Sequence, residues 1–72
     1  MQEIKINLKT PYIEVDKLLK LTDIASSGGE AHMLILDGYV KLDEVTISEK
    51  RKKVYPGSIV TVDNKYKIIV LA

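Results

Sequence analysis

The chain has 72 residues and no cysteine, which limits it to one small domain, residues 1–72, and excludes disulfides, thiolate zinc sites and thiol nucleophiles. No apolar stretch approaches the roughly 20 residues that span a bilayer, and the start of the chain lacks a signal-peptide pattern, so we expect a soluble cytoplasmic protein with no membrane partner. The net charge of +1 is the sum of two parts of opposite charge. Residues 1–49 hold five lysines and nine acidic residues, whereas residues 50–72 hold six basic residues and one aspartate.

The chain begins with a predicted strand and a first helix. Apolar and polar residues alternate over residues 3–8, which is typical of a half-buried strand. Val15, Leu18 and Leu19 then recur at helical spacing and predict a helix of roughly residues 14–21.

A second helix is predicted from its end signals. Ser26 or Ser27 is suited to cap its N-terminus, and Gly38 is the expected C-terminal stop. Ala31 and Ile35 lie on the side of this helix that we expect to face the core.

Met33 and Leu36 fall on another side of the second helix. Two readings are open: another element covers them, or they form a contact patch on the surface. We expect cover, because exposed apolar patches are usually kept small.

The rest of the chain predicts strands and turns. Short strands are expected at residues 39–42 and 45–47, with a turn at 43–44 between them. Pro56-Gly57 fits the centre of a type II turn, and residues 59–62 and 66–71 predict a hairpin. The fold class is therefore α+β: two short packed helices on a small, twisted, mainly antiparallel sheet, with an extra N-terminal strand beside the last one.

Two features suggest affinity for an anion. Lys50, Arg51, Lys52 and Lys53, here called the basic segment, concentrate positive charge and predict one positive face. Ser27-Gly28-Gly29 opens the second helix without bulky side chains, and free N–H groups at a helix start suit phosphate. Each feature also has a plain structural reading, as a solvated loop and as a tight turn with a cap.

The order of these motifs resembles a known family. A short helix, a serine-capped helix, glycine, a short strand, a basic loop and Tyr55-Pro56-Gly57 before a hydrophobic strand are similar to the RNA-binding domain named after small-subunit ribosomal protein four, also called the alpha-L motif. The likeness covers about residues 13–62 and is nearest to small free-standing bacterial members, which have a leading strand and Ser-Gly-Gly-x-Ala at the second helix.

The resemblance implies a non-catalytic module, of the kind associated with the ribosome or translation, that binds structured RNA such as ribosomal RNA or tRNA through backbone and shape. Carried over by position, the RNA-binding residues are expected to be Ser27, Gly28, Gly29, His32, Lys50, Arg51, Lys52 and Lys53. The family strand usually ends in Val-Asn-Gly, whereas this chain has Leu42-Asp43-Glu44, which places two negative charges on a turn often close to RNA.

The remaining chemistry-bearing residues give weaker signals. His32 is expected at the solvent-facing rim of the RNA surface, and a lone histidine builds no metal site. Tyr39 and Tyr55 are suited to stacking on a base, but half-buried packing is the commoner fate, and we expect packing. No catalytic residue, metal, cofactor or small-molecule substrate is predicted.

The alternative function is a protein adaptor that uses Met33, Leu36 and the acidic half of the chain.

Overall fold

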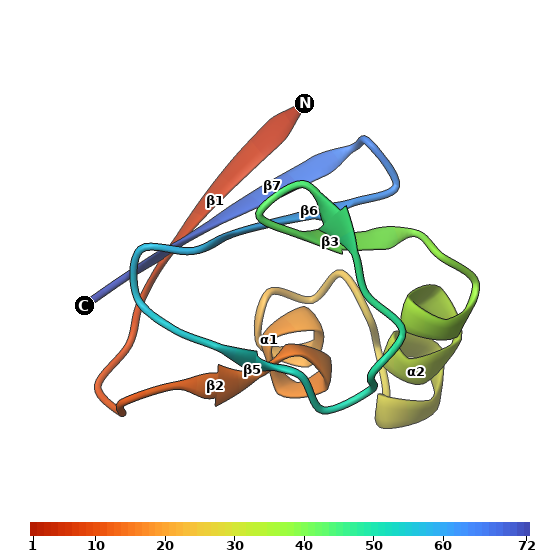
Figure 1. Ribbon diagram of the computed structural model, residues 1–72, viewed down its shortest axis with the longest axis horizontal. Helices are drawn as coiled ribbons and strands as arrows, with labels where there is room; N and C mark the ends of the chain where they lie inside the picture. The colour runs from red at the N-terminus through yellow and green to blue at the C-terminus, as the bar shows by residue number, and fades with distance from the viewer.

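In the computed structural model, which describes residues 1–72, the strands and helices form two layers (Figure 1). The upper layer in Figure 1 is a five-stranded sheet in the order β1-β7-β6-β3-β4. Its strands are β1 (Gln2–Asn7), β3 (Val40–Leu42), β4 (Val45–Thr46), β6 (Ile59–Val62) and β7 (Tyr66–Leu71).

The lower layer covers one face of this sheet. It consists of helices α1 (Val15–Leu21) and α2 (Gly28–Leu36) and a two-stranded antiparallel sheet of β2 (Ile13–Glu14) and β5 (Lys53–Val54). Figure 1 shows both helices and the small sheet on the same side of the large sheet. None of the helices has the length and apolarity needed to cross a membrane.

The large sheet has the expected pairing. β1 runs parallel to β7, whereas the β7–β6, β6–β3 and β3–β4 pairs are antiparallel. The predicted α+β class, with an N-terminal strand beside the last strand, is therefore confirmed. Ile4 and Ile6 of β1 are half-buried and Lys5 between them is exposed, as the alternation of apolar and polar residues predicts.

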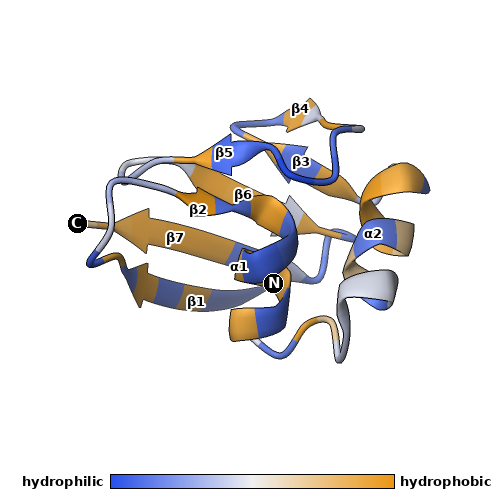
Figure 2. Cartoon of the chain, turned by 90° about the horizontal axis from the view of Figure 1, so that it is seen from below, coloured by the Kyte–Doolittle hydropathy of each residue, from blue (hydrophilic) through white to orange (hydrophobic).

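The core lies between the layers. Val15, Leu18 and Leu19 of α1 are fully buried, as are Ala31 and Ile35 of α2. The sheet supplies the opposing side chains, which are Val40, Val60, Val62, Ile68 and Val70. Figure 2 shows the apolar colouring along the inner strands β6 and β7, where it is most continuous. Burying such a Val, Leu or Ile side chain contributes about 1.5–3 kcal/mol relative to leaving it exposed.

The turns use residues with positive φ where the sequence predicts them. Gly38, with φ of 83°, ends α2, and Gly57, with φ of 98°, follows Pro56 in the predicted turn. Asp43 and Glu44 join β3 to β4 at φ of 49° and 71°, a conformation that non-glycine residues seldom adopt.

Two local predictions are wrong. Lys53, expected in the basic loop, forms β5 and pairs with Glu14 of β2, a strand that the sequence did not predict, whereas α1 at Val15–Leu21 confirms the helix predicted for roughly residues 14–21. Strands of two residues have no alternation for a sequence to display, so only the folded chain reveals this pair. Met33 and Leu36 were expected to be covered, but they are 64% and 56% exposed, because no element packs on that side of α2.

Candidate nucleic-acid interface

The N-terminus of α2 is capped within its own segment. The Ser27 hydroxyl accepts a hydrogen bond from the Glu30 amide at 3.2 Å, which confirms Ser27 as the N-cap. The Glu30 carboxylate turns back and accepts bonds from the Ser26 amide at 3.3 Å and the Ser26 hydroxyl at 3.0 Å. Since the Ala31 amide bonds the Ser27 carbonyl, the first-turn N–H groups left without a partner are those of Gly28 and Gly29.

Neither glycine is required by packing. A Cβ atom at Gly28 would meet nothing within 4 Å, and one at Gly29 would meet only the Ser27 hydroxyl at 3.9 Å. Neither residue has a positive φ. The fold therefore leaves this backbone accessible, which a larger side chain would partly cover. The Glu30 carboxylate beside it opposes an approaching anion, so charge at this helix start is mixed.

His32 is half-buried, whereas the sequence predicts a solvent-facing side chain. Its Nε2 lies 3.0 Å from Oδ2 of Asp16, and the two side chains are only 30% and 11% exposed. Asp16 is in the first turn of α1, where its other oxygen accepts a hydrogen bond from the Lys17 amide at 2.9 Å. The imidazole therefore links α2 to the start of α1.

The pKa of Asp16 reflects these contacts. Burial raises it, but the hydrogen bonds from His32 and from the Lys17 amide, together with the charges of His32 and Arg51, hold the pKa of the carboxyl below its usual value. Asp16 was not identified from the sequence as a functional residue. An acidic residue in a helix first turn is common and gave no signal of a partner sixteen positions away.

The basic segment is fixed to the start of α1 by its backbone. The Val15 amide donates to the Lys52 carbonyl at 2.9 Å, and Lys53 continues into β5 against β2. The side chains of Lys50, Arg51 and Lys53 are exposed, and that of Lys52 is half-buried. Three of the four cations therefore point into solvent from a segment with a defined path.

The basic segment and α2 both connect to the start of α1. The Lys52 carbonyl accepts a hydrogen bond from the Val15 amide, and the next residue, Asp16, contacts His32 of α2. The structure thus ties the two predicted parts of the interface to adjacent residues of α1. Ser27, Gly28 and Gly29 lie at the start of the helix that presents His32, one turn away from it.

The acidic residues next to the basic segment have separate roles. A surface depression is lined by Asp43 and Glu49 as well as by Arg51, Lys52, Lys53 and Tyr55. Oδ1 of Asp43 accepts a hydrogen bond from the Ile59 amide at 3.0 Å, so this carboxylate has a structural use within the sheet. Glu44 has neither an ion pair nor a side-chain hydrogen bond.

The tyrosines are more exposed than the sequence suggested. Tyr55 is 51% exposed, which contradicts the expected half-buried packing, and Tyr39 is also exposed. Tyr12, which the sequence analysis missed, is 39% exposed and lies beside Tyr55, with ring centroids 5.9 Å apart. No group of three or more His, Cys, Asp or Glu side chains is arranged to hold a metal ion.

Comparison with known proteins gives consistent matches. A model of the S4 domain family matches residues 6–70. YbcJ of Escherichia coli (strain K12), which has a provisional RNA-binding name, is 38% identical over 53 residues, covering 74% of this chain and 76% of YbcJ. YbcJ of Shigella flexneri matches with the same identity and coverage.

Solved structures are also similar. The solution structure of E. coli YbcJ, reported as an alpha-L motif involved in RNA binding, superposes with a TM-score of 0.70 and 32% identity over all of this chain and 89% of that one. The 30S ribosomal protein S4e from Thermoplasma acidophilum gives a TM-score of 0.57 and 25% identity over 76% of this chain and 29% of that one.

Proposed function

Because this chain belongs to the S4 domain family, we propose that it is a non-catalytic RNA-binding module that holds structured RNA by its backbone and shape. The homology to YbcJ and the shared alpha-L architecture support RNA as the partner. The adaptor alternative has no support among the relatives, so RNA binding is the function put forward.

One observation supports the location of the interface. The basic segment is tied to Val15 of α1 through the Lys52 carbonyl, and His32 of α2 contacts the next residue, Asp16, so both parts of the proposed interface connect to the start of α1. The proposed contacts are phosphates on the exposed cations of the basic segment, with the start of α2 beside them. The residues involved are Ser27, Gly28, Gly29, His32, Lys50, Arg51, Lys52 and Lys53.

The proposed RNA is structured, and ribosomal RNA and tRNA are the two candidates. The chain offers a single arginine and a short cationic stretch, which suits a few phosphates better than the reading of base edges. With three or four phosphate contacts, log Kd should change against log salt with a slope of magnitude about 2–4. We place this activity in the cytoplasm, where both RNAs are found.

The test compares two triple variants with the same net charge. Lys50→Gln, Arg51→Gln and Lys52→Gln together remove three charges from the basic segment. Lys5→Gln, Lys41→Gln and Lys67→Gln remove three charges from the outer face of the large sheet, where these residues alternate with the buried positions of β1, β3 and β7. Binding to tRNA, to a ribosomal RNA fragment and to duplex DNA is measured over a salt series.

The two variants should behave differently. The basic-segment variant should lose affinity for the structured RNAs, and its salt slope should fall by about 2–3, since each phosphate contact contributes about 0.7–0.9. The outer-face variant should keep nearly the wild-type slope. Equal losses in both would mean that only net charge matters, and unchanged binding in the first would remove the proposed interface.

A further inference from the structure

The outer face of the small β2–β5 sheet bears an aromatic pair, Tyr12 and Tyr55. The register pairs Ile13 with Val54 and Glu14 with Lys53, so Tyr12 and Tyr55 are opposite each other at the next position outward. Val54 is fully buried, and alternation therefore turns Tyr12 and Tyr55 to the solvent side together with Glu14 and Lys53. The rings lie 5.9 Å apart at an interplanar angle of 50°.

This pair does little for the core. Tyr12 and Tyr55 are 39% and 51% exposed, and neither belongs to the group of partly buried residues packed on the core. Their hydroxyl groups form no hydrogen bond within the chain. The two neighbouring rings therefore present apolar surface that the fold itself does not use.

Cations surround the aromatic pair. The ammonium of Lys53 lies 4.8 Å from the centroid of the Tyr12 ring, within cation–π range. Tyr55 lines the same surface depression as Arg51, Lys52 and Lys53. The pair therefore adjoins the basic segment directly, so an RNA strand held there would pass beside the rings.

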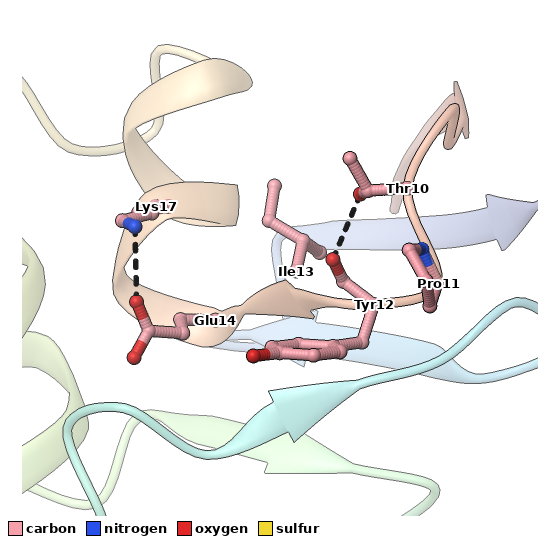
Figure 3. A pocket seen from close by; sticks show the side chains of 6 residues that line it. All are labelled: Thr10, Pro11, Tyr12, Ile13, Glu14 and Lys17. Carbon is pink, nitrogen blue, oxygen red and sulfur yellow. Dashed lines mark hydrogen bonds and ion pairs between the residues drawn. The ribbon is translucent and has the colours of Figure 1, made fainter.

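Tyr12 lines a second shallow depression, which shares no residue with the first (Figure 3). In Figure 3 its ring lies below the β2 ribbon and extends toward Glu14, whose carboxylate is paired with Lys17 at 3.1 Å. The Thr10 hydroxyl donates to the Tyr12 carbonyl at 2.9 Å, which fixes the backbone that presents the ring. Each ring of the aromatic pair therefore borders a depression that is open to solvent.

Resting on the proposed RNA binding, we propose that Tyr12 and Tyr55 form a stacking site for an unpaired base of the bound RNA, with Lys53 available to the adjoining phosphate. Bases inside a duplex have no free face, whereas bases in bulges and loops can be splayed out and stacked on aromatic side chains. A bulge or loop beside a helix would offer a free base next to the phosphates that the basic segment holds. The site would accept different bases, because every base has a π-face.

The first experiment uses two RNAs and three sets of variants. The RNAs are a hairpin stem with a single-nucleotide bulge and the same stem without the bulge. Tyr12→Leu with Tyr55→Leu keeps apolar bulk but removes the rings, and Tyr12→Phe with Tyr55→Phe keeps the rings. Tyr39→Leu changes an exposed tyrosine outside the pair and serves as the matched control.

The leucine double variant should bind the bulged RNA about 5-fold to 150-fold more weakly, the loss expected for one base stack, with no change for the unbulged stem. The phenylalanine double variant and Tyr39→Leu should retain the wild-type preference. Wild-type preference in the leucine variant would overturn the proposal.

A second measurement does not depend on any variant. With 2-aminopurine at the bulge, binding of the wild-type protein should quench its fluorescence, whereas 2-aminopurine within the stem should change little. The absence of quenching at saturation would overturn the stacking site even if the leucine variant failed to fold. If the wild-type protein binds both RNAs equally and the basic-segment variant binds both more weakly, the stacking site is refuted but RNA binding stands. If the wild-type protein binds neither RNA at low salt, RNA binding itself is refuted.

Discussion

The contact between Asp16 and His32 gives the sharpest stability prediction. Asp16→Ala removes an almost buried carboxylate that accepts hydrogen bonds from His32 at 3.0 Å and from the Lys17 amide at 2.9 Å. Losing hydrogen bonds to a charged group of this kind should lower the free energy of unfolding by about 2–3 kcal/mol. For a domain of this size, that loss corresponds to a fall in Tm of about 8–24 °C.

The dependence on pH follows from the lowered pKa of Asp16. A carboxyl whose folded-state pKa lies below its ordinary value of 3.8 stabilises the fold above that value, and this stabilisation is lost as pH falls through the folded-state pKa. The stability difference between wild type and Asp16→Ala should therefore be full at pH 6 and should shrink below about pH 4.

Urea unfolding followed by circular dichroism at pH 6 and pH 3 measures both effects. Asp37→Ala, at the exposed end of α2 with no side-chain hydrogen bond, is the matched control and should stay within about 0.5 kcal/mol of wild type. His32→Ala and the double variant complete a cycle in which we expect a coupling of about 1 kcal/mol. A loss for Asp16→Ala that is the same at both pH values, or no loss at pH 6, would refute the reasoning.

Four further predictions concern backbone positions. Gly28→Ala and Gly29→Ala should each raise the free energy of unfolding by up to about 0.5–1 kcal/mol in urea titrations, since the added Cβ has room and alanine favours helix; lower stability would mean that an unseen contact needs glycine. The same two variants should weaken RNA binding in the salt-series assay, and unchanged affinity would exclude a close backbone approach. Glu44→Gly should raise the free energy of unfolding by about 0.5–1 kcal/mol because it removes a side chain from a left-handed position at φ of 71°, and it should strengthen RNA binding if the turn lies near phosphate. Gly57→Ala, at φ of 98°, should lower the free energy of unfolding by about 1 kcal/mol or more, and a neutral result would contradict the strain argument.

Elements with a local signal were predictable from the sequence. Ser27 caps α2, Gly38 ends it, and residues 59–62 and 66–71 form the hairpin that their alternation predicts. Capping, positive φ and periodicity each involve residues only a few positions apart, so the sequence displays them directly. The motif order extended these elements to a fold and a family, which the S4 domain match over residues 6–70 bears out.

The geometry of the candidate site could not be predicted in the same way. The basic segment was visible as a run of charge, but nothing in the sequence showed that Lys52 bonds the start of α1 or that His32 contacts Asp16 there. Tyr12 gave no signal at all, because its neighbour Tyr55 is forty-three positions away and the strands that bring them together are two residues long.

The sequence by itself therefore determined the elements, their order and the chemistry available at residues 27–32 and 50–53. The tertiary structure alone decided which of these groups meet, which side chains are exposed, and that His32 is held by Asp16. The physical reason is range: helix caps, turns and alternation act between near neighbours, whereas the pairing of β2 with β5 and the contact of α1 with α2 depend on packing of the whole chain around one core.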